Sequence, residues 1–158
     1  MNNKIAELAE ESIKIELNVG EIYFLFHTLF PEDSDFWLKL VLEEENHASI
    51  IKNGIELFEP IEAFPHKILA HNLQKLKDTN EMLRSILEQF KNTYPSREKA
   101  FNTAIELETS AGELHFQHFQ SKKHFSNFEE IFHQLNEEDK DHAERILAYM
   151  KENNIHEQ

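Results

Sequence analysis

Residues 12–24 of this chain read SIKIELNVGEIYF, and residues 104–116 read AIELETSAGELHF. The two stretches align without gaps, so that Glu16 matches Glu108. Apolar residues recur in both stretches at the spacing of a helix that buries one face. The repeat therefore predicts two equivalent long helices, each carrying a Glu at the same place.

The aligned stretches also share a glycine, Gly20 in the first and Gly112 in the second, four residues after each Glu. A glycine inside a helix costs about 1 kcal/mol relative to Ala. The missing side chain either leaves room for a carboxylate, a metal ion or a small molecule, or lets the first helix pack closely on the third long helix of the bundle. The two interpretations are compatible.

A second repeat follows each stretch: EENH at residues 44–47 and DKDH at residues 139–142. Residues i and i+3 of a helix share a face. Glu44 should therefore point with His47, and Asp139 with His142, and both pairs fall within an apolar stripe. A single acid-x-x-His tetrad is weak evidence, whereas two tetrads that each follow an equivalent Glu favour a built site.

Carboxylates are costly to bury without a compensating cation, and no Lys or Arg shares these stripes. Carboxylate and imidazole without thiolate suit iron or manganese, with zinc as a further option. The sequence therefore predicts a site for two metal ions, and the alternative is a bundle whose polar residues line a solvated groove. The predicted ligands are Glu16, Glu44, His47, Glu108, Asp139 and His142.

Tyr23 lies two helical turns after Glu16 on the same face and is predicted to hydrogen-bond toward the site. His115 is its equivalent in the repeat and is the weaker candidate for such a role. The acidic neighbours of the tetrads, such as Glu43 and Glu45, rotate off the apolar stripe. We expect them on the solvated surface.

The prolines at 31, 60, 65 and 95 divide the chain. Helices are predicted over residues 3–29, 34–53, 66–91, 97–120 and 127–152, with caps at Asp33 or Ser34 and at Ser96, and a stop at Gly54. The crossover segment 55–95 joins two helical hairpins, and one long crossover is the ferritin-like arrangement of a four-helix bundle. The expected fold is all-α, in a single domain spanning residues 1–158.

Composition narrows the classes of function. A length of 158 residues fits one domain, and a net charge of −14 argues against nucleic acid and anionic membranes as partners. The absence of Cys excludes disulfides, zinc fingers and iron–sulfur sites. No apolar run approaches the ~20 residues of a membrane span, and the N-terminal residues do not resemble a signal peptide. We therefore expect a cytoplasmic protein.

Taken together, these motifs resemble the rubrerythrin branch of the ferritin-like superfamily, over nearly the whole chain. The signature is an A-I-E-L-E…E-x-x-F pattern on the first and third long helices and E-E-x-x-H-A on the second and fourth. The residues that carry it are Ile15-Glu16, Glu43-Glu44-Glu45-Asn46-His47-Ala48, Leu107-Glu108 and Glu138-Asp139-Lys140-Asp141-His142-Ala143. The resemblance implies a non-haem di-iron centre with terminal Glu16 and Glu108, bridging Glu44 and Asp139, and one His, His47 or His142, on each iron.

The chain departs from the family pattern in three ways. Without Cys there is no rubredoxin-type iron domain, so electrons are expected from an external donor protein. Peroxide-reducing rubrerythrins carry an extra Glu one turn from the equivalent of Glu108, where this chain has Ile105 and Ala111, and this weakens the expectation of peroxide reduction. Asp139 replaces a Glu with a shorter side chain, which would alter bridging, change the metal spacing or favour another metal.

The leading hypothesis is a di-iron oxidoreductase that reacts with dioxygen or hydrogen peroxide. Apolar neighbours, Ile13, Ile51 and Ile105, are expected to keep bulk water away from it. One alternative is a ferroxidase that passes ferric iron to storage. Another is a metal-binding scaffold or sensor without enzymatic activity.

Association into a homodimer is also expected. The aromatic residues Phe24, Phe36, Phe116 and Phe128 fall outside the predicted core stripes. Some of them are therefore candidates for a subunit interface.

Overall fold

The computed structural model describes residues 2–56, 72–115 and 141–157, and within these ranges the regular structure is helical, with no strand. The predicted all-α class is confirmed for this part of the chain. In chain order the elements are α1 (Asn2–Leu29), the short 3-10 helix η1 (Pro31–Asp33), α2 (Ser34–Glu56), α3 (Leu73–Asn92), α4 (Arg97–His115) and a C-terminal helix over residues 141–152.

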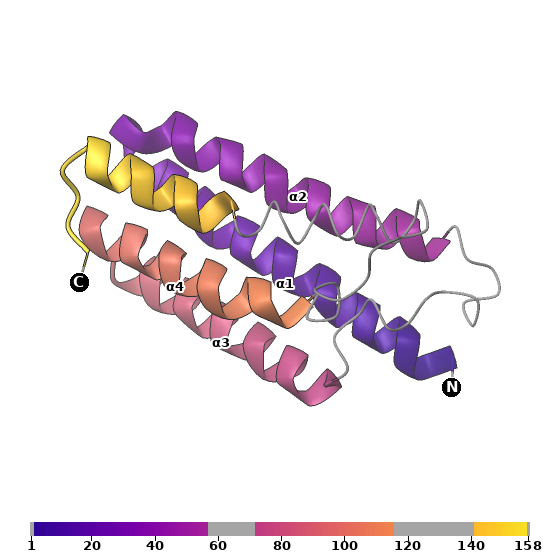
Figure 1. Cartoon of the computed structure of the whole chain (residues 1–158). Coiled ribbons are helices and arrows are strands. Elements are labelled where there is room, and N and C mark those ends of the chain that lie inside the picture. Colours follow the sequence, from indigo (N-terminus) through magenta and orange to yellow (C-terminus); the bar gives the residue numbers. More distant parts are fainter. Residues whose placement is uncertain (1, 57–71, 116–140, 158) are drawn as a thin grey trace.

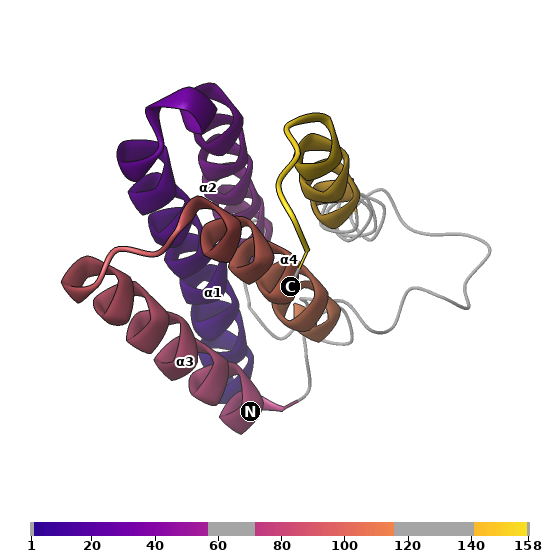
Figure 2. The same cartoon turned by 90° about the vertical axis from the view of Figure 1, so that its left-hand side faces the viewer.

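The helices run side by side as a bundle (Figure 1). η1 turns the chain between α1 and α2, which form an antiparallel hairpin, and α1 also packs along α3. Viewed from the end of the bundle, the C-terminal helix lies beside α2 and α4 (Figure 2). α2 and the C-terminal helix, which are far apart in the sequence, therefore lie side by side.

The core is built from apolar side chains at helical spacing on every helix. Helical periodicity predicts a buried stripe on α2 at Trp37, Leu40, Val41, Ala48 and Ile51, and all five side chains are buried. Helical periodicity also predicts Met82 on the buried stripe of the crossover helix. This is wrong, because Met82 lies on the outer side of α3 and is 41% exposed. Its neighbours Leu76, Leu83, Leu87 and Phe90 are buried as expected.

Three helix boundaries can be compared with the capping and stop residues in the sequence. The backbone N–H of Lys99 donates to the Ser96 hydroxyl, so the predicted cap of α4 is confirmed. Gly54 does not end α2, which continues to Glu56 with Gly54 buried in the helix. α3 begins at Leu73, where the side chain of Asn72 caps it by accepting from the N–H of Lys75. Residues 66–71 of the predicted crossover helix lie outside the described residues.

A buried ion pair fixes one end of the bundle. Asp33 of η1 is 1% exposed, and its carboxylate accepts two hydrogen bonds from Arg97 of α4, at 2.6 and 2.7 Å. The Tyr149 hydroxyl of the C-terminal helix donates to the same carboxylate at 3.0 Å. One side chain of the connection between α1 and α2 thus holds both helices of the other half.

Two of the aromatic residues expected at a subunit interface differ in position. Phe24 is 54% exposed, whereas Phe36 packs inside against Trp37, Phe101 and Tyr149. Phe116 and Phe128 lie outside the described residues. The homodimer stays a prediction.

Among the described helices, none combines the length and the apolar character that a bilayer crossing demands.

Candidate metal centre

Three of the four predicted carboxylate ligands are buried in the middle of the bundle. Glu16 of α1 is 4% exposed, Glu44 of α2 is 3% and Glu108 of α4 is 9%. His47 and His142 are each 1% exposed. Asp139 lies outside the described residues. Five of the six predicted ligands are therefore buried polar side chains, each set among the apolar residues of its helix.

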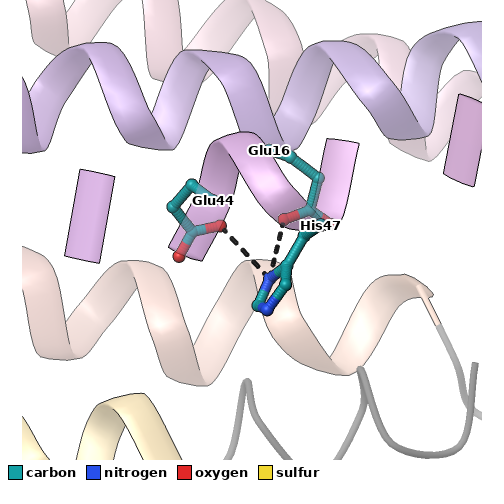
Figure 3. Close-up of side chains that lie close together, drawn as sticks. All are labelled: Glu16, Glu44 and His47. Carbon is teal, nitrogen blue, oxygen red and sulfur yellow. Dashed lines mark ion pairs between the residues drawn. The ribbon is translucent and has the colours of Figure 1, made fainter. Parts of the chain in front are cut away.

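The first half of the chain brings together Glu16, Glu44 and His47 (Figure 3). His47 Nδ1 lies 3.7 Å from an oxygen of Glu16 and 3.7 Å from an oxygen of Glu44. One ligand atom from each of the three residues lies within 4.8 Å of the others. The two 3.7 Å distances match atoms that surround a single cation, because metal–ligand bonds of about 2 Å keep the ligand atoms within about 4 Å of one another.

The second half supplies Glu108 and His142, and it shares Glu44 with the first group. His142 Nδ1 lies 3.1 Å from Glu44 Oε1 and 3.5 Å from Glu108 Oε1. The two oxygens of Glu44 therefore face different histidines, with Oε2 toward His47 and Oε1 toward His142. A carboxylate placed in this way can bridge two neighbouring cations.

The two imidazoles are arranged alike. Both turn Nδ1 toward the carboxylates, and their rings stack with centroids 5.4 Å apart and planes 11° apart. His47 and His142 occupy equivalent positions in the sequence repeat, so this similarity is what an internal symmetry of the ligand set predicts. The other ring nitrogen of His142, Nε2, makes a contact outside the centre.

For His142 that outer contact is Glu43, a residue that sequence reasoning assigned to the solvated surface. Its Oε2 lies 3.2 Å from His142 Nε2, and Arg145 donates to its other oxygen at 3.1 Å. The side chain of Glu43 is only 28% exposed. One signal in the sequence could have indicated the role of Glu43. Arg145 lies one turn after His142, and this spacing places a cation beside the same imidazole.

Electrostatics couples these three groups. Burial alone would raise the pKa of Glu43, but hydrogen bonds with His142 and Arg145 lower it to about 2. Burial would lower the pKa of His142, and its contacts with Glu108, Glu43 and Glu44 raise it to about 12. A carboxylate cage that holds a proton this firmly on an imidazole is one that favours positive charge.

Tyr23 contacts the centre as predicted, since its hydroxyl donates a short hydrogen bond to Glu108 Oε1. Tyr23 is fully buried and packs against Trp37. The hydrogen bond fixes the orientation of the Glu108 carboxylate from the side of α1. His115, the repeat equivalent, belongs to α4, but its side chain lies outside the described residues.

Among the described residues, Gly20 faces α2. A Cβ added at Gly20 would lie 3.4 Å from Glu44 Cβ and 4.0 Å from the carbonyl oxygen of Val41. The predicted close packing of the first helix on the third long helix at this glycine stays a prediction. The glycine allows α1 to approach α2 at the shared carboxylate. The surroundings of Gly112 lie outside the described residues.

The donor set fits hard or borderline divalent cations. It offers three carboxylates and two imidazoles, with no thiolate, and this composition suits iron, manganese or zinc. Burying three carboxylates side by side is costly unless cations offset their charge. Arg145 does not offset the charge of Glu16, Glu44 or Glu108, because it pairs with Glu43 and Asp141.

Of the three apolar neighbours predicted to exclude water, one is fully buried and two are partly buried. Ile51 is fully buried one turn after His47, as expected for a residue that excludes water. Ile13 and Ile105 are only partly buried.

The chain matches no family model, no curated protein and no solved structure.

Proposed function

We propose that the protein is a di-metal oxidoreductase of rubrerythrin type, on a ferritin-like bundle, that reacts with dioxygen or peroxide. The observation that carries the proposal is the position of Glu44, whose two oxygens face His47 and His142 and which belongs to both potential metal groups. Two bound iron ions would supply the one-electron steps by which such an oxidant is reduced.

The chain's own residues have distinct tasks in this proposal. Glu16 and His47 would hold one cation, Glu108 and His142 the other, and Glu44 would bridge them. Their burial keeps bulk water from the reacting oxygen species, and Tyr23 holds Glu108 in place through its hydroxyl. Electrons would enter from an external donor protein, since the chain has no Cys with which to bind an iron–sulfur centre.

Anaerobic titration with ferrous iron tests the proposal. We expect two iron ions per chain, followed by oxidation to ferric iron when oxygen or peroxide is added. Glu44→Ala should lose both sites, and His142→Ala should lose one of them. Glu45→Gln is the matched control, because Glu45 is exposed on the same turn of α2 and should leave iron binding unchanged.

The outcomes separate the competing functions. Binding of fewer than one iron per chain would refute the metal centre, and so would full occupancy in both variants. Binding without oxidation would favour a scaffold or sensor. Oxidation followed by release of ferric iron to an acceptor would favour ferroxidase activity over repeated turnover with an electron donor.

A further inference from the structure

We propose that Asn80 of α3 sets the register in which α3 packs on α1, and thereby the height at which α4 presents Glu108 to Tyr23. The evidence is a set of hydrogen bonds among three polar side chains within an otherwise apolar contact between two helices. The register is a property of the metal-free chain, so the proposal does not depend on the function proposed above.

α1 and α3 lie side by side and run in the same direction (Figure 1). Their contacts advance together along both helices, because Asn80 lies against Glu11 and Asn18, and Phe90 lies against Phe26 with ring centroids 5.8 Å apart. Along α3, buried residues recur at alternating intervals of four and three, at Leu76, Asn80, Leu83, Leu87 and Phe90. Such intervals are typical of the contact face in a coiled coil.

α1 carries a matching series on the side that meets α3. Its members are Leu8, Glu11, Ile15, Asn18 and Ile22. Three of these are buried apolar side chains, so Glu11 and Asn18 are the polar members of the series on α1. Asn80 is the polar member of the series on α3. Within these two series the contact is therefore apolar except where Glu11, Asn18 and Asn80 meet.

Both ends of the Asn80 amide have partners on α1. The amide nitrogen donates to the carbonyl oxygen of Glu11 at 2.9 Å and to Glu11 Oε2 at 2.8 Å. The amide oxygen accepts from Asn18 Nδ2 at 2.7 Å. Asn80 is 3% exposed, and Lys14 Nζ lies 2.9 Å from Glu11 Oε1, where it offsets the charge of the carboxylate. The amide is therefore buried and fully paired.

A displaced register would break this pairing. If α3 moved along α1 by one helical turn, about 5 Å, Asn80 would lie between two apolar members of the α1 series. It could then no longer contact both Glu11 and Asn18. A buried amide that loses a partner is costly, whereas one Leu of α3 can replace another at each step. A single buried Asn specifies the register of coiled coils for the same reason.

The register of α3 also sets the position of α4. The backbone N–H of Thr93 donates to the last turn of α3, and Ser96 caps α4, so only two residues separate the capping residues. An axial displacement of α3 therefore moves α4 with it. α4 carries Glu108, whose carboxylate accepts from the Tyr23 hydroxyl of α1. Asn80 thus acts on this contact from outside the candidate centre.

Distances between pairs of spin labels on the metal-free protein test the proposal. The chain has no Cys, so introduced cysteines carry the only labels. Ala6→Cys with Glu88→Cys reports on α1 and α3, and Ala6→Cys with Lys99→Cys reports on α1 and α4, all at exposed positions. Each pair should give one narrow distance distribution when Asn80 is present.

The decisive variant replaces Glu11, Asn18 and Asn80 by Leu together. The contact is then apolar throughout, so the denaturation midpoint should stay the same or rise. Both label pairs should nevertheless show a second distance, displaced by about 5 Å, because one-turn shifts are no longer penalised. Asn80→Leu alone should also populate the displaced register, and it decides the question if the triple variant does not fold. Circular dichroism verifies the helical fold of each protein.

Leu83→Ala is the matched control, because Leu83 belongs to the same series of α3 and is fully buried. The cavity should lower its denaturation midpoint, while the label distances stay single and unshifted. Unshifted single distances in both Leu variants would overturn the proposal, since apolar packing would then set the register. A second distance in Leu83→Ala would also overturn it, because any weakening of the contact would then release α3. An α1–α3 distance that changes without the α1–α4 distance would refute the effect on Glu108.

Discussion

His142 Nε2 lies 3.2 Å from Glu43 Oε2, while Nδ1 of the same ring lies 3.1 Å from Glu44 Oε1. Neighbouring carboxylates on α2 thus hold the imidazole from both sides. Glu44 belongs to the proposed centre and Glu43 lies outside it, where Arg145 completes its charge balance. An outer carboxylate of this kind fixes which nitrogen of the ring faces a metal.

Glu43→Gln should weaken metal binding at the second group without removing a ligand. The amide holds His142 less firmly than the carboxylate does, and loss of such an outer partner typically costs ~10–100-fold in metal affinity. Competition titration against a metal chelator measures the change. Glu45→Gln should have no effect, and equal affinities for wild type and Glu43→Gln would contradict the role of Glu43.

The acid stability of the metal-free protein should depend on Glu43. Its pKa is lowered to about 2 from 4.5, so its contribution is complete above the higher value and is lost as the pH falls toward the lower one. Between about pH 5 and about pH 3, the stability difference between wild type and Glu43→Gln should shrink by about 1–2 kcal/mol, allowing for solvent screening. Urea unfolding measures both proteins.

The contribution of His142 to stability depends on pH in the opposite direction. Its pKa is raised to about 12 from 6.5, so its contribution is complete below 6.5 and is lost as the pH rises toward 12. It is therefore constant over the acid range and does not mask the effect of Glu43. A stability difference that stays constant from about pH 5 to about pH 3 would show that the contact between Glu43 and His142 stabilises nothing.

Substitutions at Gly20 should separate helix stability from space at the centre. Gly20→Ala places a methyl group 3.4 Å from Glu44 Cβ, an ordinary contact, and should raise stability by up to about 1 kcal/mol through helix propensity. Gly20→Val adds two more methyl groups beside the shared carboxylate and should lower metal affinity. Thermal melting and metal titration of both variants test this, and full affinity in Gly20→Val would exclude a spatial role for the glycine.

Removal of Arg97 should destabilise the bundle strongly. Asp33 is buried, and Arg97→Ala would leave its carboxylate with the Tyr149 hydroxyl as its one side-chain partner among the described residues, at a cost of about 3–5 kcal/mol. Chemical denaturation measures the loss. Lys99→Ala, on the exposed side of the same helix, is the control and should change stability by less than about 0.5 kcal/mol.

Much of the fold and the inner part of the centre could be predicted from the order of residues. The stripe of α2, the cap at Ser96 and the burial of Glu16, Glu44 and Glu108 depend on helical periodicity and local hydrogen bonds. Both are properties of neighbouring residues. The hydrogen bond of Tyr23 followed from the same reasoning, because it extends along one helical face toward the site.

Tertiary structure alone decided which helices meet and how side chains are shared between them. Glu43 pairs with Arg145, 102 residues away, and Asp33 pairs with Arg97, 64 residues away. Gly20 faces α2 because the hairpin sets the rotation of α1, and a residue's angle about its own helix does not specify its neighbour. The repeat placed equivalent ligands on equivalent faces, and only packing brought both histidines onto the single carboxylate of Glu44.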